Sequence, residues 1–183
     1  MSGRIVLLSG GVDSASLLAL CAEQTVYAEA LFVDYGQRAA EPERAAAVTI
    51  AKAYDVTLRY VSAQIGSIPE GEILGRNALL VHLALATAPP GATTIMIGIH
   101  AGTTYRDCSP VFVEVMQASL DLHRDGTVQI AAPFVTWAKH EVYAYARASD
   151  VPLDFTYSCE AGTVPACGTC LSCQDRKLLD ACA

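Results

Sequence analysis

The chain has 183 residues, of which 52% are hydrophobic and 17% are charged, and its formal net charge is −7. This length and composition suit one domain with a sizeable buried core and exclude a disordered chain. Lys and Arg number only 12 against 19 Asp and Glu, and they are scattered, whereas proteins that hold a nucleic-acid backbone concentrate basic residues. We therefore expect a small-molecule substrate and no nucleic-acid partner.

Nothing in the sequence suggests export or a membrane span. The start of the chain, Met1–Leu8, has one Arg and a short apolar run, without the apolar region and cleavage site of a signal peptide. No apolar run reaches the roughly 18–20 residues that cross a bilayer. We expect a cytoplasmic protein, in which an odd number of Cys does not indicate a disulfide framework.

Strand and helix patterns alternate along the chain. The first expected strand, Arg4–Ser9, ends in two glycines, and an apolar-periodic helix follows at Ala15–Ala22. Further strands are expected at Val26–Asp34, Val56–Val61, Thr93–Ile99 and Val128–Ala131. Further helices are expected at Ala39–Tyr54, Asn77–Ala88, Pro110–His123 and Lys139–Ala148, with a short last helix around Asp175–Ala181. This alternation predicts a single α/β domain over residues 1–183, with a parallel sheet between two helical layers and ligands at the carboxyl ends of its strands.

The segment Ser9–Ser14 reads SGGVDS and stands between the first strand and the first helix. Its two glycines let the backbone approach an anion, and the helix N-terminus behind them offers free N–H groups and the positive end of the helix dipole. It is not a Walker A loop, because the Gly-Lys-Ser/Thr ending is missing. The alternative is an ordinary turn with a Ser or Asp cap. The motif resembles the SGGxDS signature of PP-loop ATP-pyrophosphatases, which implies ATP binding by Leu8, Ser9, Gly10, Gly11, Val12, Asp13 and Ser14.

Four Cys near the C-terminus have the spacing of a metal site. Cys167, Cys170 and Cys173 follow a CxxCxxC pattern, and Cys159 lies upstream within the segment 157–176. Four thiolates suit tetrahedral Zn²⁺ and leave no open position, so the predicted role is structural. Free thiols or an iron–sulfur cluster are the alternatives. Of the remaining thiols we expect Cys21 in the core, Cys108 in packing, and no role for Cys182.

The motifs together resemble the QueC family of 7-cyano-7-deazaguanine synthases, nearly from end to end. Besides the SGGVDS loop and the cysteine segment with Arg176, the matching segments are Asp34–Arg38 with Glu41 or Glu43, Gly75–Asn77, Tyr105–Cys108, and Ala132–Phe134 with Lys139. The chain is shorter than is usual for the family. Residues between Gly98 and Tyr105 look trimmed, an Asp often found there is absent, and Arg106 replaces a Pro.

The resemblance implies that 7-carboxy-7-deazaguanine, ammonia and ATP are converted to the nitrile 7-cyano-7-deazaguanine (preQ0). The carboxylate is adenylated, ammonia displaces AMP to give the amide, and a second adenylation allows dehydration. Mg²⁺ and a homodimer are also implied. An enzyme that stops at the amide, a related PP-loop enzyme acting on tRNA, and a nucleotide-binding adaptor without turnover remain alternatives.

The resemblance also suggests roles for individual residues. Asp13, Lys139 and Arg76 are the catalytic candidates: Asp13 either caps the helix or holds Mg²⁺ through water, and Lys139 either neutralises phosphate or is a solvated residue at a helix start. Arg38 and Arg76 clamp a phosphate or the substrate carboxylate, or form surface ion pairs with Glu41 or Glu72.

The remaining candidates concern the nucleoside and the substrate. Tyr35 and Gln37, with Arg38, are expected at the nucleotide, and Asn77 and Tyr105, with Arg76, at the substrate. Asp107 is expected to accept hydrogen bonds from the guanine-like edge of the substrate. The histidines lack metal-ligand spacing and are predicted to be non-catalytic: His82, His100, His123 and His140.

Overall fold

A computed structural model describes residues 3–66 and 73–181, so the predictions on Glu72 and Cys182 lie outside the described residues. Five parallel strands form one sheet in the order β3-β2-β1-β4-β5. The strands are β1 Gly3–Leu7, β2 Ala28–Asp34, β3 Leu58–Ser62, β4 Ala92–Met96 and β5 Gln129–Ala131. The helices are α1 Val12–Glu23, α2 Ala40–Ala53, α3 Arg76–Ala86, α4 Pro110–Arg124, α5 Lys139–Ala148 and α6 Leu171–Ala181, with a 3₁₀ turn η1 at Leu153–Phe155.

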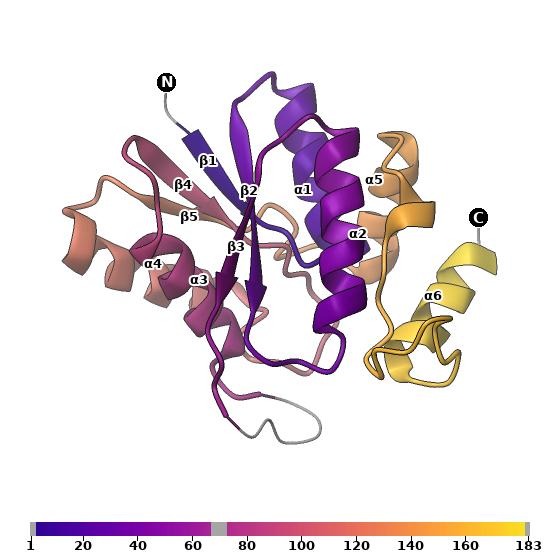
Figure 1. Cartoon of the computed structure of the whole chain (residues 1–183). Helices are drawn as coiled ribbons and strands as arrows, with labels where there is room; N and C mark the ends of the chain where they lie inside the picture. The colour runs from indigo at the N-terminus through magenta and orange to yellow at the C-terminus, as the bar shows by residue number, and fades with distance from the viewer. Residues whose placement is uncertain (1–2, 67–72, 182–183) are drawn as a thin grey trace.

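The sheet lies between two helical layers, which confirms the predicted α/β architecture. Helices α3 and α4 cover one face, while α1, α2 and α5 cover the other (Figure 1). Successive residues of a strand point to opposite faces, so Ile5 and Leu7 of β1 enter one core cluster and Val6 enters the other. Burial on both faces explains why the strands read as nearly continuous apolar runs.

The predicted elements are confirmed in type, but most of their boundaries differ by one to four residues, and three of these differences concern segments near the candidate sites. Strand β1 ends at Leu7, so Leu8 and Ser9 belong to the loop that follows it. Strand β4 ends at Met96, because its partner β5 has only three residues and stops opposite Met96. Helix α6 begins at Leu171 rather than near Asp175, and it therefore carries Cys173 on its first turn.

The strand order places a topological switch point between β1 and β4. The chain leaves β1 for α1 on one face of the sheet and enters β4 from α3 on the other face. The loops after β1 and β4 therefore run to opposite faces at the carboxyl edge of the sheet, which is where open α/β sheets bind ligands. The SGGVDS loop lies at this edge.

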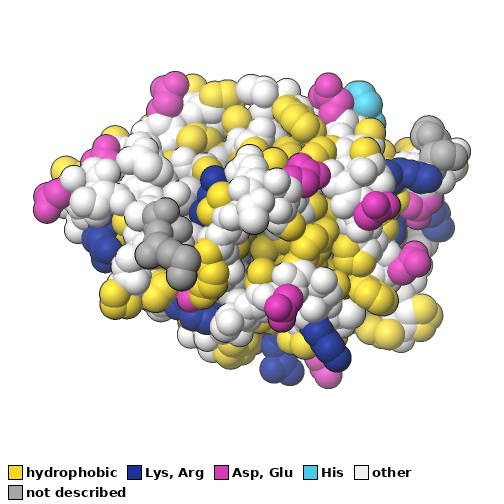
Figure 2. Space-filling model, turned by 90° about the horizontal axis from the view of Figure 1, so that it is seen from above, with side chains coloured by type: hydrophobic (Ala, Val, Ile, Leu, Met, Phe, Trp, Pro, Cys, Tyr) yellow, Lys and Arg dark blue, Asp and Glu magenta, His cyan; other side chains and the backbone are white. Residues whose placement is uncertain are grey.

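Two further observations bear on partners. Among the described residues, the structure contains no helix with the length and apolar character needed to span a membrane. Figure 2 views the molecule from above relative to Figure 1, and the Lys and Arg side chains on that face lie apart, with acidic side chains between them. That face therefore lacks the continuous basic surface typical of nucleic-acid binding.

Candidate functional site

The SGGVDS loop is held by contacts among its own residues and by α2. Gly10 has φ +87°, and a Cβ there would stand 2.5 Å from the carbonyl oxygen of Glu43, so only glycine suits the position. The Ser9 and Ser14 hydroxyl oxygens are 3.2 Å apart, and the Ser14 hydroxyl donates to the Gly11 carbonyl at 2.9 Å. The loop thus presents two hydroxyls beside the start of α1.

The predicted cap by Asp13 is wrong. Gly11 is the N-cap of α1, and no side chain accepts a hydrogen bond there as a cap. Because Asp13 lies within the first turn of the helix, its side chain projects sideways and reaches Lys139 instead. No side chain therefore caps the N-terminus of α1, as anion binding by the motif requires.

Asp13 and Lys139 form an ion pair beside the SGGVDS loop. Lys139 is the first residue of α5, and its Nζ lies 2.6 Å from Asp13 Oδ2, with a side chain only about one-third exposed (34%). The interpretation of Lys139 as a solvated helix-start residue is therefore wrong. The other carboxylate oxygen, Asp13 Oδ1, is buried and has no hydrogen-bond partner among the described residues. A buried acceptor without a partner is costly, so this oxygen is suited to a bound group such as a hydrated cation.

His100 is a neighbour that the sequence reasoning missed. It follows β4 at the same edge of the sheet, its Nε2 lies 4.0 Å from Asp13 Oδ2, and its Nδ1 contacts the Ala101 carbonyl at 2.6 Å. Sequence spacing to other possible ligands could not reveal this neighbour. His100 reaches the loop because it follows β4, and β4 pairs with β1. Gly98, two residues earlier, lies against the Asp13 backbone: a Cβ there would be 2.9 Å from the Asp13 carbonyl carbon.

The loop after β2 is closed by Gln37. Its Oε1 accepts from the Tyr35 N–H at 2.9 Å, and its Nε2 donates to Glu43 Oε2 at 2.9 Å. These contacts indicate that Gln37 shapes the loop. Burial raises the pKa of the Glu43 carboxyl and of the Tyr35 hydroxyl, and the positive charge of Arg76 opposes both shifts. Arg76, Tyr35 and Glu43 therefore share one electrostatic environment next to the phosphate loop.

Asn77 joins the start of α3 to the segment Tyr105–Cys108. It is only 2% exposed, and its Nδ2 donates to the Asp107 carbonyl at 3.1 Å while its backbone N–H donates to Asp107 Oδ2 at 3.4 Å. Its Oδ1 accepts from Arg76 Nη2 at 3.2 Å. Because both polar ends are engaged within the protein, these contacts favour a positioning role over a direct purine contact. Cys108 packs against the core cluster under α3 and α4, as expected, and burial raises the pKa of its thiol.

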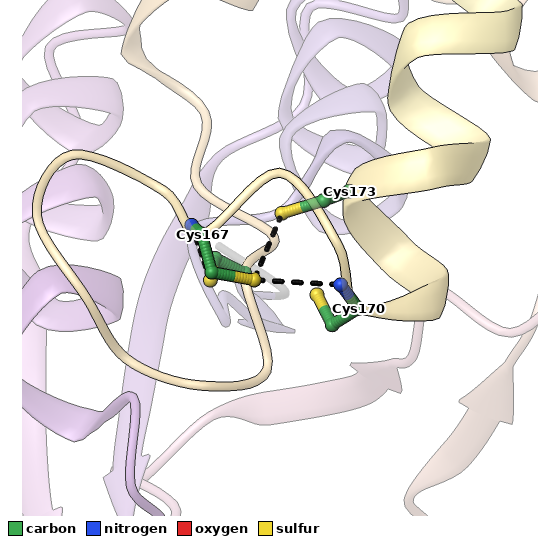
Figure 3. A group of neighbouring side chains, drawn as sticks. Cys167, Cys170 and Cys173 are labelled. Atoms are coloured by element: carbon green, nitrogen blue, oxygen red, sulfur yellow. Dashed lines mark hydrogen bonds between the residues drawn. The ribbon is translucent and has the colours of Figure 1, made fainter.

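The four predicted metal ligands lie together. The sulfurs of Cys159, Cys167, Cys170 and Cys173 all lie within 4.8 Å of one another, and the Cys167 and Cys173 sulfurs are 4.0 Å apart. Four thiolates bound to one Zn²⁺ at about 2.3 Å are separated by about 3.8 Å. Figure 3 shows the Cys167 thiol directed toward Cys170 and Cys173. The cluster therefore could hold one metal ion.

Backbone N–H groups prepare two of these thiols for ligation. The Cys167 N–H donates to Cys159 Sγ at 3.3 Å, which lowers the pKa of the Cys159 thiol to about 5. The N–H groups of Thr169 and Cys170 donate to Cys167 Sγ at 3.4 Å, and they lower the pKa of the Cys167 thiol. A thiolate is the form that binds metal, so the N–H groups favour ligation by Cys159 and Cys167, whereas burial raises the pKa of the Cys173 thiol. In contrast, Cys21 is buried in the core and contacts the Met96 sulfur, as expected.

A parallel sheet in this strand order, with SGGVDS at its switch point, defines an α/β protein of the PP-loop class. Comparison with known proteins agrees. NMN synthetase from Francisella tularensis has the same fold, with a TM-score of 0.53 at 18% identity over 87% of this chain and 67% of that one. The U34-tRNA thiolase NcsA from Methanococcus maripaludis, solved with its [4Fe-4S] cluster, gives a TM-score of 0.54 at 14% identity over 98% of this chain and 64% of that one.

The chain belongs to the QueC family, described as "Queuosine biosynthesis protein QueC", whose family model matches residues 3–74 and 62–179. A curated relative, the 7-cyano-7-deazaguanine synthase of Synechococcus sp. (strain RCC307), is 33% identical over 205 aligned positions, which cover 96% of this chain and 92% of the relative. The aligned positions outnumber the 183 residues here, so the relative has residues without a counterpart, and the shorter length noted from the sequence is confirmed.

Proposed function

We propose that this protein is an ATP-dependent ligase that converts 7-carboxy-7-deazaguanine and ammonia to 7-cyano-7-deazaguanine. The observation that carries the proposal is the SGGVDS loop at the switch point, in a chain that belongs to the QueC family over nearly its whole length. The name of the curated relatives, 7-cyano-7-deazaguanine synthase, supports the reaction. The N-terminus of α1, which no side chain caps, supports the use of ATP.

The loop is proposed to hold the β- and γ-phosphates of ATP. Ser9 offers a hydroxyl donor, and Ser14 offers a second one once its hydroxyl exchanges the Gly11 carbonyl for a phosphate oxygen. Gly10 and Gly11 let the backbone approach the phosphates, and the positive end of the α1 dipole attracts their negative charge. Asp13 Oδ1 has the chemistry to accept a water of hydrated Mg²⁺, and Lys139 neutralises charge beside it. These residues favour departure of pyrophosphate when the substrate carboxylate oxygen attacks the α-phosphorus.

The reaction then takes two rounds. In the first round the substrate carboxylate displaces pyrophosphate from the α-phosphorus of ATP and forms an acyl-adenylate. Ammonia then attacks the acyl carbon, which releases AMP and a proton and leaves the amide. In the second round the amide oxygen attacks ATP and releases pyrophosphate, and loss of one N–H proton gives an adenylated imidate. Loss of AMP together with the remaining N–H proton leaves the nitrile. Both rounds use the same phosphate loop, so positioning and charge stabilisation are the main work of the protein.

Residues at the start of α3 are proposed to hold the substrate. Arg76 would pair with its carboxylate, Asp107 would accept hydrogen bonds from its guanine-like edge, and Tyr105, with an exposed fraction of 41%, would cover the ring. Asn77 positions Arg76 and Asp107 relative to each other. Tyr35 and Arg38, on the loop after β2, are proposed to contact the nucleotide, with Gln37 shaping that loop.

The four-cysteine site is proposed to hold structural Zn²⁺. Sulfur atoms within 4.8 Å of one another fit a single tetrahedral ion, whereas the thiolates of an iron–sulfur cluster are divided between two or four irons, so that sulfurs on different irons lie further apart. Elemental analysis should find about one zinc per chain. A Cys170→Ser variant should lose stability more than chemistry, while iron with visible cluster absorbance would refute the assignment.

The deciding experiment is mass spectrometry of the products from 7-carboxy-7-deazaguanine, ATP and ammonia. The nitrile is expected, with pyrophosphate and AMP released in equal amounts. Accumulated amide would mean that the enzyme stops after the first round. ATP consumption without either product would refute the substrate assignment and leave only the ATP-pyrophosphatase chemistry. Asp13→Asn serves as the inactive control, because it removes the charge that faces Lys139.

We further propose a cytoplasmic homodimer, on the resemblance to the family. Light scattering of the purified protein tests the oligomeric state, and a mass equal to that of one chain of 19.3 kDa would refute it.

A further inference from the structure

The cysteine segment contacts the phosphate loop directly through Tyr157. Its backbone N–H donates to the Gly10 carbonyl at 2.9 Å, and its own carbonyl oxygen lies over Gly11, where a Cβ would be 3.7 Å away. At its other end, the Tyr157 hydroxyl donates to the Thr163 carbonyl at 2.8 Å, inside the loop that separates Cys159 from Cys167. Tyr157 therefore bridges the phosphate loop and the cysteine loop.

A second contact reaches the same place through α2. Gly162, whose N–H donates to the Cys159 carbonyl, has φ +70°, and a Cβ there would be 2.3 Å from the Arg38 carbonyl oxygen. Arg38 precedes α2, and the Glu43 carbonyl in the first turns of α2 lies against Gly10. Both routes from the cysteine loop therefore end at Gly10, the residue with positive φ at the centre of the phosphate loop.

Ligation of a metal by the four cysteines would fix this segment. Between Pro152 and Ser172 the one buried residue is Cys159, and the others are half-buried or exposed. So little buried surface cannot offset the entropy of ordering about twenty residues. Bonds from four cysteines to one ion supply free energy that folding of the segment otherwise lacks.

We infer that occupancy of the four-cysteine site sets the conformation of Gly10, so that metal binding and nucleotide binding are thermodynamically coupled. Tyr157 and Gly162 are the positioning residues of this coupling. The inference rests on the proposed ATP-binding role of the loop and extends it, since the zinc would act on the affinity for ATP as well as on stability. By linkage, a bound nucleotide must then tighten zinc binding by the same factor.

The test measures binding of a non-hydrolysable ATP analogue with Mg²⁺ by calorimetry, before and after removal of zinc with a chelator. Removal of zinc should weaken binding of the analogue about 5–150-fold, the usual range of such couplings. The analogue should strengthen Zn²⁺ binding by the same factor. Hydrogen exchange of the peptide around Gly10 should speed up without zinc. Equal analogue affinities with and without zinc would overturn the inference. Absence of analogue binding to the zinc-loaded protein would instead overturn the proposed function.

Glycine variants test the path in zinc-loaded protein. Gly162→Ala drives a Cβ into the Arg38 carbonyl, whereas Gly126→Ala has the same φ of +70° but meets only Asp121 Oδ1 at 3.9 Å. Gly162→Ala should keep its zinc and bind the analogue at least about tenfold more weakly, and Gly126→Ala should match the wild type. Wild-type affinity in folded Gly162→Ala would refute the path.

Tyr157→Phe supplies the decisive measurement if Gly162→Ala or the zinc-free protein fails to fold. It removes the hydroxyl that reaches Thr163 and keeps the backbone N–H that donates to Gly10. The zinc-loaded variant should bind the analogue more weakly than the zinc-loaded wild type, a comparison that needs no zinc-free protein. Equal affinities of the two zinc-loaded proteins would overturn the inference.

Discussion

Replacing Gly98 by Ala tests how tightly the end of β4 holds the phosphate loop. A Cβ at this position would lie 2.9 Å from the Asp13 carbonyl carbon and 3.0 Å from both the Asp13 carbonyl oxygen and the Ser14 nitrogen. All three neighbours are backbone atoms, so none can rotate away. Ordinary carbon contacts begin near about 3.5 Å. The phosphate loop and the segment that follows β4 must therefore separate by about half an ångström. Overpacking of this kind destabilises a folded protein by about 1–3 kcal/mol.

The displaced atoms belong to the proposed pyrophosphate site, so function should change together with stability. A shift of about 1 Å in a catalytic group lowers the rate about a hundredfold, and half that shift should lower it about tenfold. Urea unfolding measures the first effect, and pyrophosphate release at saturating ATP measures the second. Gly3→Ala is the matched control, because its Cβ would meet the Tyr27 ring at an ordinary 3.6 Å. It should change the unfolding free energy by less than about 0.5 kcal/mol.

The reasoning is refuted if Gly98→Ala unfolds at the wild-type urea concentration and releases pyrophosphate at the wild-type rate. Equal destabilisation by Gly3→Ala would also refute it, since the effect would then belong to the replacement of glycine in general and not to the contact with Asp13.

Three other predictions concern residues around the phosphate loop. Lys139→Met should lower pyrophosphate release at least about tenfold, since it leaves the half-buried Asp13 carboxylate without its 2.6 Å partner; an unchanged rate would remove Lys139 from the site. Asp107→Asn should weaken 7-carboxy-7-deazaguanine binding by about 1–3 kcal/mol in calorimetry, with ATP-analogue affinity as the unaffected control. Burial raises the pKa of the Glu43 carboxyl, so the protonated carboxyl favours folding and its ionisation opposes folding. The stability that the protonated carboxyl contributes is fully present below its unfolded pKa and is lost as pH rises through its folded pKa. Glu43→Gln should therefore be more stable than wild type at neutral pH and equal to it at about pH 4, and a pH-independent difference in urea unfolding would contradict this.

The sequence by itself determined the features that depend on neighbours along the chain. Apolar runs alternating with 3.6-residue periodicity predicted the parallel α/β sheet, because strand and helix periods are properties of short segments. The SGGVDS motif and the spacing of Cys167, Cys170 and Cys173 predicted a loop and a ligand cluster for the same reason: each depends on residues only a few positions apart.

The tertiary structure alone decided which distant residues meet. Asp13 and Lys139 are 126 positions apart, and whether Asp13 caps its helix or pairs with a lysine depends on where α5 packs against α1. The proximity of His100 to Asp13 follows from β4 pairing with β1, a neighbour that strand order assigns and that no local pattern encodes. The glycine contact between the cysteine loop and Arg38 is of the same kind, since close backbone approach is set by how layers pack and leaves no periodic signal in the sequence.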